Sequence, residues 1–399
     1  MKAAPIIAAI RERNSSLSGT SAQIQQILVH TGQHYDESMS NSFFVDLNLP
    51  KPDVYLGVGS GSHAVQTAEI MRQFEQVLLR EKPDALIVVG DVNSTIACAL
   101  VAAKISYDAE GTRPLIAHVE AGLRSFDRGM PEEVNRIATD HLSDLLFVTE
   151  ESGIQNLQRE GIAAEKIHFV GNTMIDSLLF FKDKADKSTV LDRLGLRERP
   201  NAAGSGSEIR RYSLLTLHRP SNVDNQETFQ NILGGLAELS QECPIVFSAH
   251  PRTKKRIAEF GLEHLYEFED ARDSNGGAGA VRATNGIRLI EPLGYLDFLC
   301  LMKNASLVVT DSGGIQEETT CLGVPCVTVR ENTERPVTIT CGTNTLAGTS
   351  NDGIRDAVRA QGTRQKSARV PEKWDGKAAG RIVGALVEEF QKKELEAVR

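Results

Sequence analysis

The chain reads Leu307-Val308-Val309-Thr310-Asp311-Ser312-Gly313-Gly314-Ile315-Gln316-Glu317-Glu318 at the point that decides its fold. The apolar run predicts a buried strand, and the polar turn after it opens a helix that continues through Cys321. Gly323 and Pro325 end that helix before the next apolar run. Two adjacent glycines at such a turn let backbone N–H groups approach an anion closely, and the helix N-terminus adds about half a positive charge.

The polar side chains of this turn allow two interpretations. Ser312 can cap the helix or bind a phosphate oxygen, and Glu318, one turn further on, can accept hydrogen bonds from a ribose diol. An ordinary turn with a capping serine explains Ser-Gly-Gly equally well. Capping does not need the carboxylate pair Glu317 and Glu318, so the pair favours a nucleotide site.

Short apolar runs alternate with helical patterns along the whole chain. Strands are expected at 27–29, 85–89, 115–119, 145–148, 213–217, 245–248, 287–290, 307–309 and 326–329, and helices at 63–80, 95–104 and 132–142. Continuous apolar strands between helices predict an α/β fold with parallel sheets covered on both faces. The rhythm occurs twice, which predicts two doubly wound, Rossmann-like domains with ligands at the carboxyl ends of the strands, in the cleft between the halves.

Composition narrows the class of protein. A chain of 399 residues with 41% hydrophobic and 24% charged residues is typical of a soluble protein of two domains. It contains no apolar stretch near the roughly 20 residues of a membrane span. The net charge of −9 argues against a nucleic-acid-binding surface. Six cysteines without a CxxC pair predict reduced thiols and a cytoplasmic protein.

Two carboxylates follow predicted strands of the first half. Asp91, in Gly90-Asp91, is either a group of the ligand cleft or a helix cap. Glu120 ends a strand that should be fully buried, where an unpaired carboxylate costs several kcal/mol. A purely structural role for Glu120 therefore requires Arg124 as its ion-pair partner, and the alternative is a carboxylate that faces the cleft.

Further polar residues stand at the starts of helices and the ends of strands. Glu132 lies in the first turn of a helix that begins with proline, and Arg136, four residues on, shares its face. His218 and Arg219 end the first strand of the second half. Carboxylates from one domain with a histidine and an anion-binding turn from the other fit general acid–base chemistry on a phosphate-bearing substrate. The nine histidines show no metal-ligand spacing, so no metal site is predicted.

The motifs resemble those of the non-hydrolysing UDP-N-acetylglucosamine 2-epimerases, in the same order over nearly the whole chain. They are Gly90-Asp91, His118-Val119-Glu120-Ala121-Gly122-Leu123-Arg124, Pro131-Glu132-Glu133-Val134-Asn135-Arg136, Val170-Gly171-Asn172-Thr173-Met174-Ile175-Asp176, Leu217-His218-Arg219, Thr310 to Glu318, Thr333-Glu334-Arg335-Pro336 and Cys341-Gly342-Thr343. The resemblance implies the two-lobed GT-B architecture, with a first domain over 1–172, a UDP-binding domain over 173–373, and a last helix at about 374–398 that crosses back onto the first lobe.

The resemblance also implies the reaction and its residues. Enzymes of this family eliminate UDP across C1–C2 of the sugar, leaving 2-acetamidoglucal, and add UDP back after protonation on the other face. The implied roles are proton transfer or stabilisation of the glucal for Asp91, Glu120 and Glu132, assistance to the leaving phosphate for His218, orientation of the sugar for Arg136, diphosphate binding for Ser312, Gly313 and Gly314, ribose binding for Glu318, nucleotide binding for Arg335, and positions flanking the uracil for Leu293 and Phe298. No cofactor is implied, the substrate is a UDP-sugar for cell-envelope polysaccharides, and a homodimer is expected.

The chain departs from the family pattern in two places. Family members bind an activating second UDP-sugar through polar residues after the second strand and an arginine; here the stretch is Thr31-Gly32-Gln33-His34-Tyr35-Asp36 and the arginine position is Glu69, which argues against such activation. The family begins with a strand and an arginine-bearing loop that leads to a lysine. Lys2 resembles that lysine, so the resemblance implies a substrate-binding role for it. The first strand and the loop arginine are missing before Lys2, so we expect upstream codons that encode an apolar strand ending in Gly-(Thr or Ala)-Arg-Pro.

Three functions stay open at this point. The first is the epimerase acting on UDP-N-acetylglucosamine, and the second is an epimerase for a modified UDP-diacetamido sugar. The third is a nucleotide-sugar glycosyltransferase on the same fold, or an inactive, truncated UDP-binding relative. A transferase does not need three carboxylates directed at C2, so the set of Asp91, Glu120 and Glu132 favours an epimerase.

Overall fold

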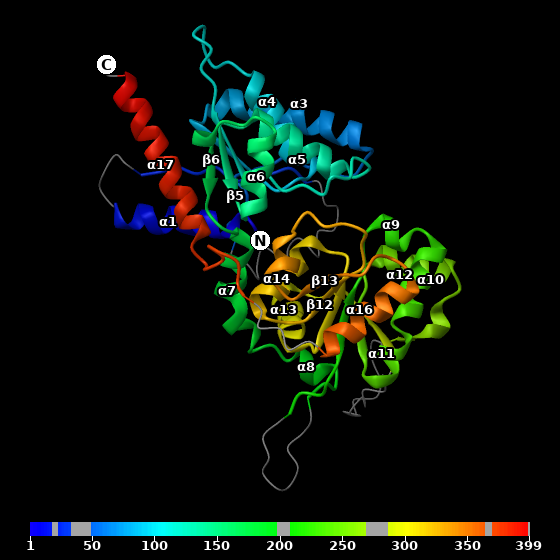
Figure 1. The fold of residues 1–399 in the computed structure, drawn as a ribbon. Coiled ribbons are helices and arrows are strands. Elements are labelled where there is room, and N and C mark those ends of the chain that lie inside the picture. The colour runs from blue at the N-terminus through cyan, green and yellow to red at the C-terminus, as the bar shows by residue number, and fades with distance from the viewer. Residues whose placement is uncertain (18–22, 33–48, 198–207, 269–285, 364–368, 398–399) are drawn as a thin grey trace. The chain divides into compact units, whose positions relative to one another are not determined.

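The computed structural model describes residues 1–17, 23–32, 49–197, 208–268, 286–363 and 369–397. Residues 33–36, part of the stretch expected to bear on activation, lie outside them. The chain forms two compact units (Figure 1): unit 1 is Met1–Phe180 with Glu372–Arg399, and unit 2 is Phe181–Pro371. Both are α/β and all their sheets are parallel, as the alternation of apolar runs and helices predicts.

Unit 1 contains two parallel sheets. A four-stranded sheet has the order β3-β4-β5-β6, and β1 and β2 form a separate pair. The strands are β1 (Val29–His30), β2 (Val54–Tyr55), β3 (Ala85–Val89), β4 (Leu115–Ala121), β5 (Leu145–Val148) and β6 (Ile167–Phe169). Every residue of β4 and β5 is buried, which explains the uninterrupted apolar sequence of β5; β4 buries His118 and Glu120 among its apolar residues.

Helices cover both faces of the four-stranded sheet. They are α1 (Ala4–Ser16), α3 (His63–Glu81), α4 (Asn93–Lys104), α5 (Pro131–Leu142), α6 (Glu151–Arg159) and α17 (Ala378–Ala397), with α7 (Thr173–Ala185) across the boundary between the units and a 3₁₀ turn at Ala164–Lys166. On one face Ala117 packs in a cluster with Ile6 of α1 and Ile382 of α17. On the other, Ile116 packs with Ile70 of α3. Each large aliphatic side chain buried in this way contributes about 1.5–3 kcal/mol.

The last helix is anchored to unit 1 by polar contacts as well as by packing. The indole Nε1 of buried Trp374 donates to the carbonyl of Thr149 at 3.0 Å. The carboxylate of Asp176 accepts from Ala378 N at 3.1 Å and from Ala379 N at 2.7 Å, at the start of α17. The two contacts of Asp176 satisfy backbone donors that a helix N-terminus leaves open, and α17 also packs against α1 (Figure 1).

Unit 2 is built on one seven-stranded parallel sheet with the order β13-β12-β11-β7-β8-β10-β9. Its strands are β7 (Ser213–Thr216), β8 (Ile245–Ser248), β9 (Tyr266–Phe268), β10 (Ile287–Ile290), β11 (Leu307–Thr310), β12 (Cys326–Thr328) and β13 (Asn344–Leu346). Strand β11 pairs with β7 in the register that sets Thr310 opposite Thr216. Residues that follow these two strands therefore emerge at the same edge of the sheet.

The helices of unit 2 are α8 (Val190–Arg193), α9 (Pro220–Val223), α10 (Gln226–Gly235), α11 (Ala237–Glu242), α12 (Pro251–Glu259), α13 (Tyr295–Asn304), α14 (Gly313–Leu322), α15 (Val337–Thr340) and α16 (Asn351–Thr363), with a 3₁₀ turn at Glu263–Leu265. Helix α14 ends at Gly323 in the left-handed conformation, as the sequence predicts. Within the described ranges, no helix of either unit is long and apolar enough to cross a membrane.

Candidate active site

Asp91 follows β3, and Glu120 lies near the end of the neighbouring strand β4. Both stand at the same end of the sheet, because β3 pairs with β4 in the register Val89 to Val119. The pairing of β4 with β5 shifts between Val119 and Ala121, and Glu120 lies at this irregularity with a φ of +78°. Such a backbone conformation costs a residue other than glycine about 1–3 kcal/mol and occurs preferentially at functional sites. The strain therefore marks Glu120 as more than a packing residue.

Lys2 is the ion-pair partner of Glu120, whose side chain is only 5% exposed. Gly90 borders the pair with a φ of +74°, and a Cβ on Gly90 would lie 3.2 Å from Lys2 Nζ and 3.4 Å from Glu120 Oε2. The glycine thus lets the lysine and the carboxylate meet beside the turn that carries Asp91. Lys2 and Glu120, both candidates from the sequence, are brought together by the fold.

Arg124 does not neutralise Glu120, so the structural interpretation that required this partner is wrong. Its Nη2 lies 2.8 Å from Asp140 Oδ2 and 2.6 Å from Glu160 Oε2. Asp140 is fully buried on α5. Burial opposes its ionisation, but His118 and Arg124 outweigh this effect and lower its pKa.

Arg136 links Asp91 to α5 from within the protein. Its Nη1 lies 2.5 Å from Asp91 Oδ2, its Nη2 lies 2.7 Å from Glu133 Oε2, and its side chain is 2% exposed. Glu133 also accepts hydrogen bonds from the backbone N–H groups of Ser125 and Phe126. Arg136 is thus placed to fix the position of the Asp91 carboxylate, which adds to the role toward the sugar that the resemblance implies.

Glu132 is the second residue of α5. It is half-buried, and its side chain makes no hydrogen bond or ion pair with any other described residue. In contrast to Asp91 and Glu120, its carboxylate is not held by a cation in the described part of the chain. A carboxylate in this state is able to exchange a proton with a ligand.

The glycine turn of unit 2 leaves its serine hydroxyl available. Ser312 is the N-cap of α14, yet its side chain makes no capping hydrogen bond, and its backbone N–H donates to Thr310 Oγ1 at 3.0 Å. The side chain is half-exposed. Of the two interpretations of Ser312, the geometry favours the anion ligand over the cap.

Gly313 allows a close approach of charged side chains from behind the turn. A Cβ at this position would lie 2.6 Å from Arg335 Nη1 and 2.7 Å from Glu334 Oε1. A contact under 3.0 Å forces something to shift, so a larger residue would displace the Arg335 guanidinium. The glycine at 313 is therefore required by packing against Arg335, whether or not an anion binds in front of it.

Arg335 belongs to a buried network of charges. It pairs with Glu317 at 2.7 Å and Glu334 at 2.6 Å, while Glu334 also meets Arg330 at 2.8 Å and Arg219 at 3.7 Å. Burial opposes the ionisation of Glu334, but the guanidinium groups of Arg335 and Arg330 outweigh it and hold the pKa of Glu334 well below its ordinary value. Three arginines thus converge on one carboxylate behind the turn, and they make this part of unit 2 suited to an anion.

His218 is oriented by Asp311, a residue that the sequence did not single out. The Nδ1 of His218 lies 2.8 Å from Asp311 Oδ1, and the same carboxylate accepts the backbone N–H groups of His218 and Arg219 at 3.1 and 2.9 Å. Asp311 is fully buried, whereas the His218 side chain is 55% exposed. The histidine therefore offers its Nε2 to a ligand from a fixed ring orientation, the usual arrangement of a catalytic imidazole.

Glu318 is buried on α14 and accepts a hydrogen bond from the Tyr295 hydroxyl at 2.9 Å. Burial is the main cause that raises its pKa to about 8. Leu293 and Phe298, expected beside a uracil, flank the start of α13 and are half-buried. A carboxyl group with a raised pKa, such as that of Glu318, occurs preferentially at functional sites.

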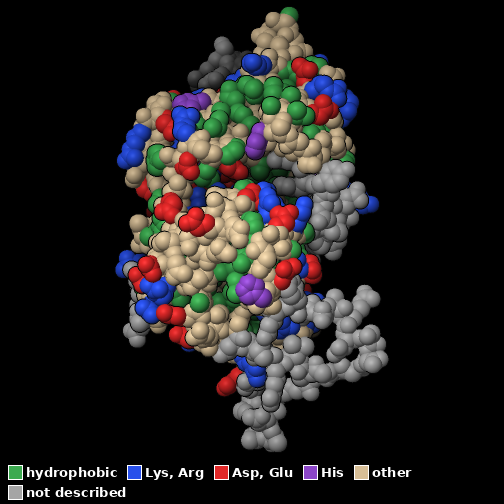
Figure 2. Space-filling model, turned by 90° about the vertical axis from the view of Figure 1, so that its right-hand side faces the viewer, with side chains coloured by type: hydrophobic (Ala, Val, Ile, Leu, Met, Phe, Trp, Pro, Cys, Tyr) green, Lys and Arg blue, Asp and Glu red, His purple; other side chains and the backbone are tan. Residues whose placement is uncertain are grey.

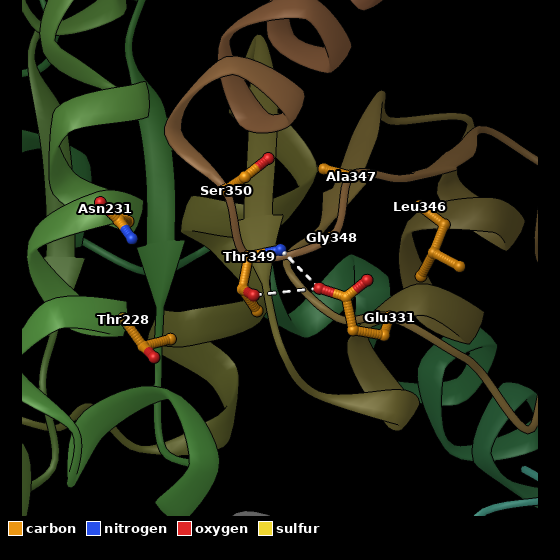
Figure 3. A pocket seen from close by; sticks show the side chains of 8 residues that line it. All are labelled: Thr228, Asn231, Glu331, Leu346, Ala347, Gly348, Thr349 and Ser350. Atoms are coloured by element: carbon orange, nitrogen blue, oxygen red, sulfur yellow. Dashed lines mark hydrogen bonds between the residues drawn. The ribbon is translucent and has the colours of Figure 1, made fainter.

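A pocket of about 540 Å³ in unit 2 is lined by none of these residues. It is lined by Thr228, Asn231, Glu331, Leu346, Ala347, Gly348, Thr349 and Ser350. Figure 3 shows that the Glu331 carboxylate is held by the backbone and hydroxyl of Thr349, each at 3.0 Å. The perturbed and strained groups lie elsewhere, so we do not place the site in this pocket.

Three further observations concern metal binding, surface charge and the position of the activating arginine. No group of three or more histidine, cysteine, aspartate or glutamate side chains in the described ranges could hold a metal ion. On the face shown in Figure 2, acidic and basic side chains are interspersed. At the position expected for an activating arginine, Glu69 pairs with Arg72 at 2.7 Å.

Comparisons with known proteins agree on one family. Residues 18–387 match the family model described as UDP-N-acetylglucosamine 2-epimerase. The UDP-N-acetylglucosamine 2-epimerase of Methanocaldococcus jannaschii is 43% identical over 388 residues, which cover 97% of this chain and 95% of the relative. A crystal structure of the M. jannaschii enzyme in complex with UDP-GlcNAc and UDP matches with a TM-score of 0.80 at 42% identity, over 97% of this chain and 96% of that one.

A relative with a different substrate is nearly as similar. The UDP-2,3-diacetamido-2,3-dideoxy-D-glucuronate 2-epimerase of Pseudomonas aeruginosa is 40% identical over 339 residues, covering 84% of each chain. Sequence identity alone therefore does not decide which of the two UDP-sugars is the substrate of this chain.

Proposed function

Because this chain belongs to the UDP-N-acetylglucosamine 2-epimerase family, we propose that it interconverts UDP-N-acetylglucosamine and UDP-N-acetylmannosamine without hydrolysis. The reaction removes the C2 proton and expels UDP from C1, giving 2-acetamidoglucal, and then returns a proton to C2 from the other face as UDP adds back to C1. Atoms balance within each step, and no cofactor is consumed. The GT-B arrangement with a ligand between two lobes, and the homodimer, stay predictions from the resemblance.

The observation that carries the proposal is the strained and buried carboxylate of Glu120, paired with Lys2 beside Asp91. Neither the sheet nor the core needs a carboxylate at this place. Proton transfer at C2 needs a base on one face of the sugar and an acid on the other. Glu120, Glu132 and Asp91 supply three carboxylates in three different environments, the first paired with lysine, the second half-exposed and the third held by Arg136.

Departure of UDP needs groups that meet the phosphates. His218, oriented by Asp311, is suited to protonate or hydrogen-bond the oxygen that leaves C1. The available Ser312 hydroxyl and the N–H groups of Gly313 and Gly314 suit the diphosphate, and Glu318 suits the ribose. Firm retention of UDP is part of the mechanism, because UDP must add back to the glucal.

The test is isotope exchange in heavy water. The purified protein is incubated with UDP-N-acetylglucosamine in D₂O without an acceptor, and the sugar is followed by NMR. We expect deuterium at C2 and the appearance of the manno epimer. Unlabelled sugar after full equilibration time would reject the proposal, and transfer of the sugar to an added acceptor would indicate a transferase.

The same assay decides between the two substrates. The similarity to the P. aeruginosa enzyme makes UDP-2,3-diacetamido-2,3-dideoxy-D-glucuronate the second candidate. Parallel reactions with the two sugars give kcat/KM for each. A ratio of at least about tenfold, or about 1.4 kcal/mol, in favour of UDP-N-acetylglucosamine is expected. The reverse ratio would assign the enzyme to the diacetamido sugar.

A further inference from the structure

His118 is a histidine without any exposed atom, in the middle of strand β4. Its Nδ1 lies 2.6 Å from Asp140 Oδ1, and its Nε2 lies 2.9 Å from the carbonyl oxygen of Gly90. Its neighbours across the sheet, Val88 and Leu146, are apolar. Both ring nitrogens therefore face one polar atom each.

These two partners fix the protonation of the ring. A carbonyl oxygen only accepts hydrogen bonds. Asp140 is also an acceptor: its second oxygen is bound by Arg124 at 2.8 Å and by the backbone N–H of Gly122 at 3.1 Å, and His118 and Arg124 outweigh burial to lower its pKa, which favours the carboxylate. A neutral imidazole has one donor and one acceptor and would leave a lone pair against an oxygen in a buried place. Against an ionised Asp140, the imidazolium is the form that satisfies both contacts.

The contact to Gly90 couples this charge to the carboxylates of the proposed reaction. Gly90 has a φ of +74°, and its N–H donates to the carbonyl of Val119 at 3.0 Å. Asp91 is the next residue after Gly90, and Glu120 lies two positions after His118 on the same strand. The imidazolium thus ties the turn that carries Asp91 to the strand that carries Glu120.

We propose that His118 is a positioning residue, permanently protonated at physiological pH, whose imidazolium clamps the Gly90–Asp91 turn to β4 and holds Asp91 and Glu120 in register for proton transfer. Its role in catalysis rests on the proposed function, but its charge does not. Burial alone would lower its pKa, yet Asp140 and the Gly90 carbonyl outweigh burial and raise it.

The charges around the ring balance its own. Asp140 faces it from α5, and Glu120, paired with Lys2, lies on its own strand. Arg124 binds the second oxygen of Asp140 and also pairs with Glu160. The Nε2 of His141 lies 3.6 Å from Glu160 Oε2. Asp140 therefore lies between two cations, His118 and Arg124, and is the anion on which the charge of the ring depends.

The charge is tested by NMR of protein labelled with ¹⁵N-histidine at pH 8.5. An unperturbed histidine is about 1% protonated at that pH. We expect signals of a histidine that keeps both ring nitrogens protonated, and we expect these signals to vanish in His118→Gln. A neutral ring assigned to residue 118 would overturn the proposal whatever the activity of the enzyme.

The positioning role is tested by kinetics on the same variant. Glutamine can donate to Asp140 or to Gly90 but not to both. We expect a fall in kcat of about 10- to 100-fold with KM and the UDP dissociation constant changed less than about threefold, because the residues proposed to bind UDP belong to unit 2. The matched control is His168→Gln, a half-buried histidine on β6 of the same sheet, which should keep wild-type kcat.

Further outcomes keep the two proposals apart. A His118→Gln enzyme with kcat within twofold of wild type would reject the positioning role, even with the charged ring in place. In Asp140→Asn the ring of His118 loses its anion. We therefore expect kcat of this variant to fall as the pH rises from 6 to 8, a fall that the wild type lacks. Absence of this fall would also count against the proposal. If wild-type protein incorporates no deuterium at C2, the proposed function fails, while the NMR result still decides the state of His118.

Discussion

Glu318 should make the binding of a UDP-sugar depend on pH. Its carboxyl group is 3% exposed, and burial raises its pKa from 4.5 to about 8. To accept hydrogen bonds from both hydroxyls of a ribose it must be ionised. At pH 6 only about 1% of the protein has it ionised, so binding pays a penalty of about 2.7 kcal/mol, which vanishes above pH 8. The affinity should therefore rise about 100-fold from pH 6 to pH 9.

Calorimetry across this range checks the value. The measurement uses UDP-N-acetylglucosamine, whose phosphates do not titrate there, in a Glu120→Gln background that prevents turnover. Buffers of different ionisation enthalpy should show the release of about one proton on binding at pH 6–7. Adding Glu318→Gln should abolish both the slope and the proton release, and should weaken binding at pH 9 by about 10- to 100-fold. His218 is retained in both proteins, so it cannot cause the difference. Parallel pH profiles would refute the reasoning.

The same group should affect stability in the opposite direction. Since the folded-state pKa lies above the ordinary 4.5, the folded protein keeps a proton that the unfolded chain has lost between pH 4.5 and about 8. The free energy of unfolding therefore falls as pH rises through this window, by up to about 5 kcal/mol from this group alone. Glu318→Gln should match the wild-type Tm near pH 4 and exceed it at pH 9. A variant that is less stable at pH 9 would contradict the assignment.

Other expectations concern the chemistry and the phosphates. Glu120→Gln and Glu132→Gln should each cut turnover by about 10²–10⁴-fold with UDP affinity retained; turnover within a few-fold of wild type would remove the assignment. Asp311→Asn should lower kcat about 10- to 1,000-fold by releasing the His218 ring, with little change in KM, and a change in KM alone would point to a binding role. By calorimetry, Ser312→Ala should weaken UDP about tenfold, and Gly313→Val should weaken it more, because its Cβ displaces the guanidinium behind the turn. Unchanged UDP affinity in both would return the turn to a purely structural role.

The sequence predicted every interior strand of the four-stranded and seven-stranded sheets in the described part of the chain, but only one of their four edge strands, β3. The runs at 85–89, 145–148, 245–248 and 287–290 coincide with β3, β5, β8 and β10. The strands that it did not predict, β2, β6, β9 and β13, each lie at an edge of a sheet. A strand between two others is covered on both faces and reads as a continuous apolar run, whereas an edge strand tolerates residues such as His168 or Asn344 and is short.

The site shows a similar division between local and distant information. Candidate residues could be predicted because each follows a strand or opens a helix, where parallel sheets carry their ligands. Their partners could not, because these lie far away in sequence: Asp311 is 93 positions from His218, and Glu160 is 36 from Arg124. The assumed pairing of Arg124 with Glu120 failed for this reason. Three carboxylates compete for one guanidinium, and only the packing of α5 and α6 against β4 decides among them.

The molecule contains two histidine–aspartate pairs, His118–Asp140 and His218–Asp311, and the histidines differ in burial. This difference alone can give the two pairs different roles. In each pair a buried carboxylate fixes the Nδ1 side of the ring, at 2.6 Å for His118 and 2.8 Å for His218. For His118 the Nε2 is bound to a buried carbonyl, so its proton has nowhere to go and the ring serves as a fixed charge. The Nε2 of His218 makes no hydrogen bond within the described ranges, and its side chain is 55% exposed, so this nitrogen is open to the leaving phosphate of the proposed reaction. A proton donor needs an open nitrogen and a clamp needs a closed one, and the two rings satisfy these opposite requirements.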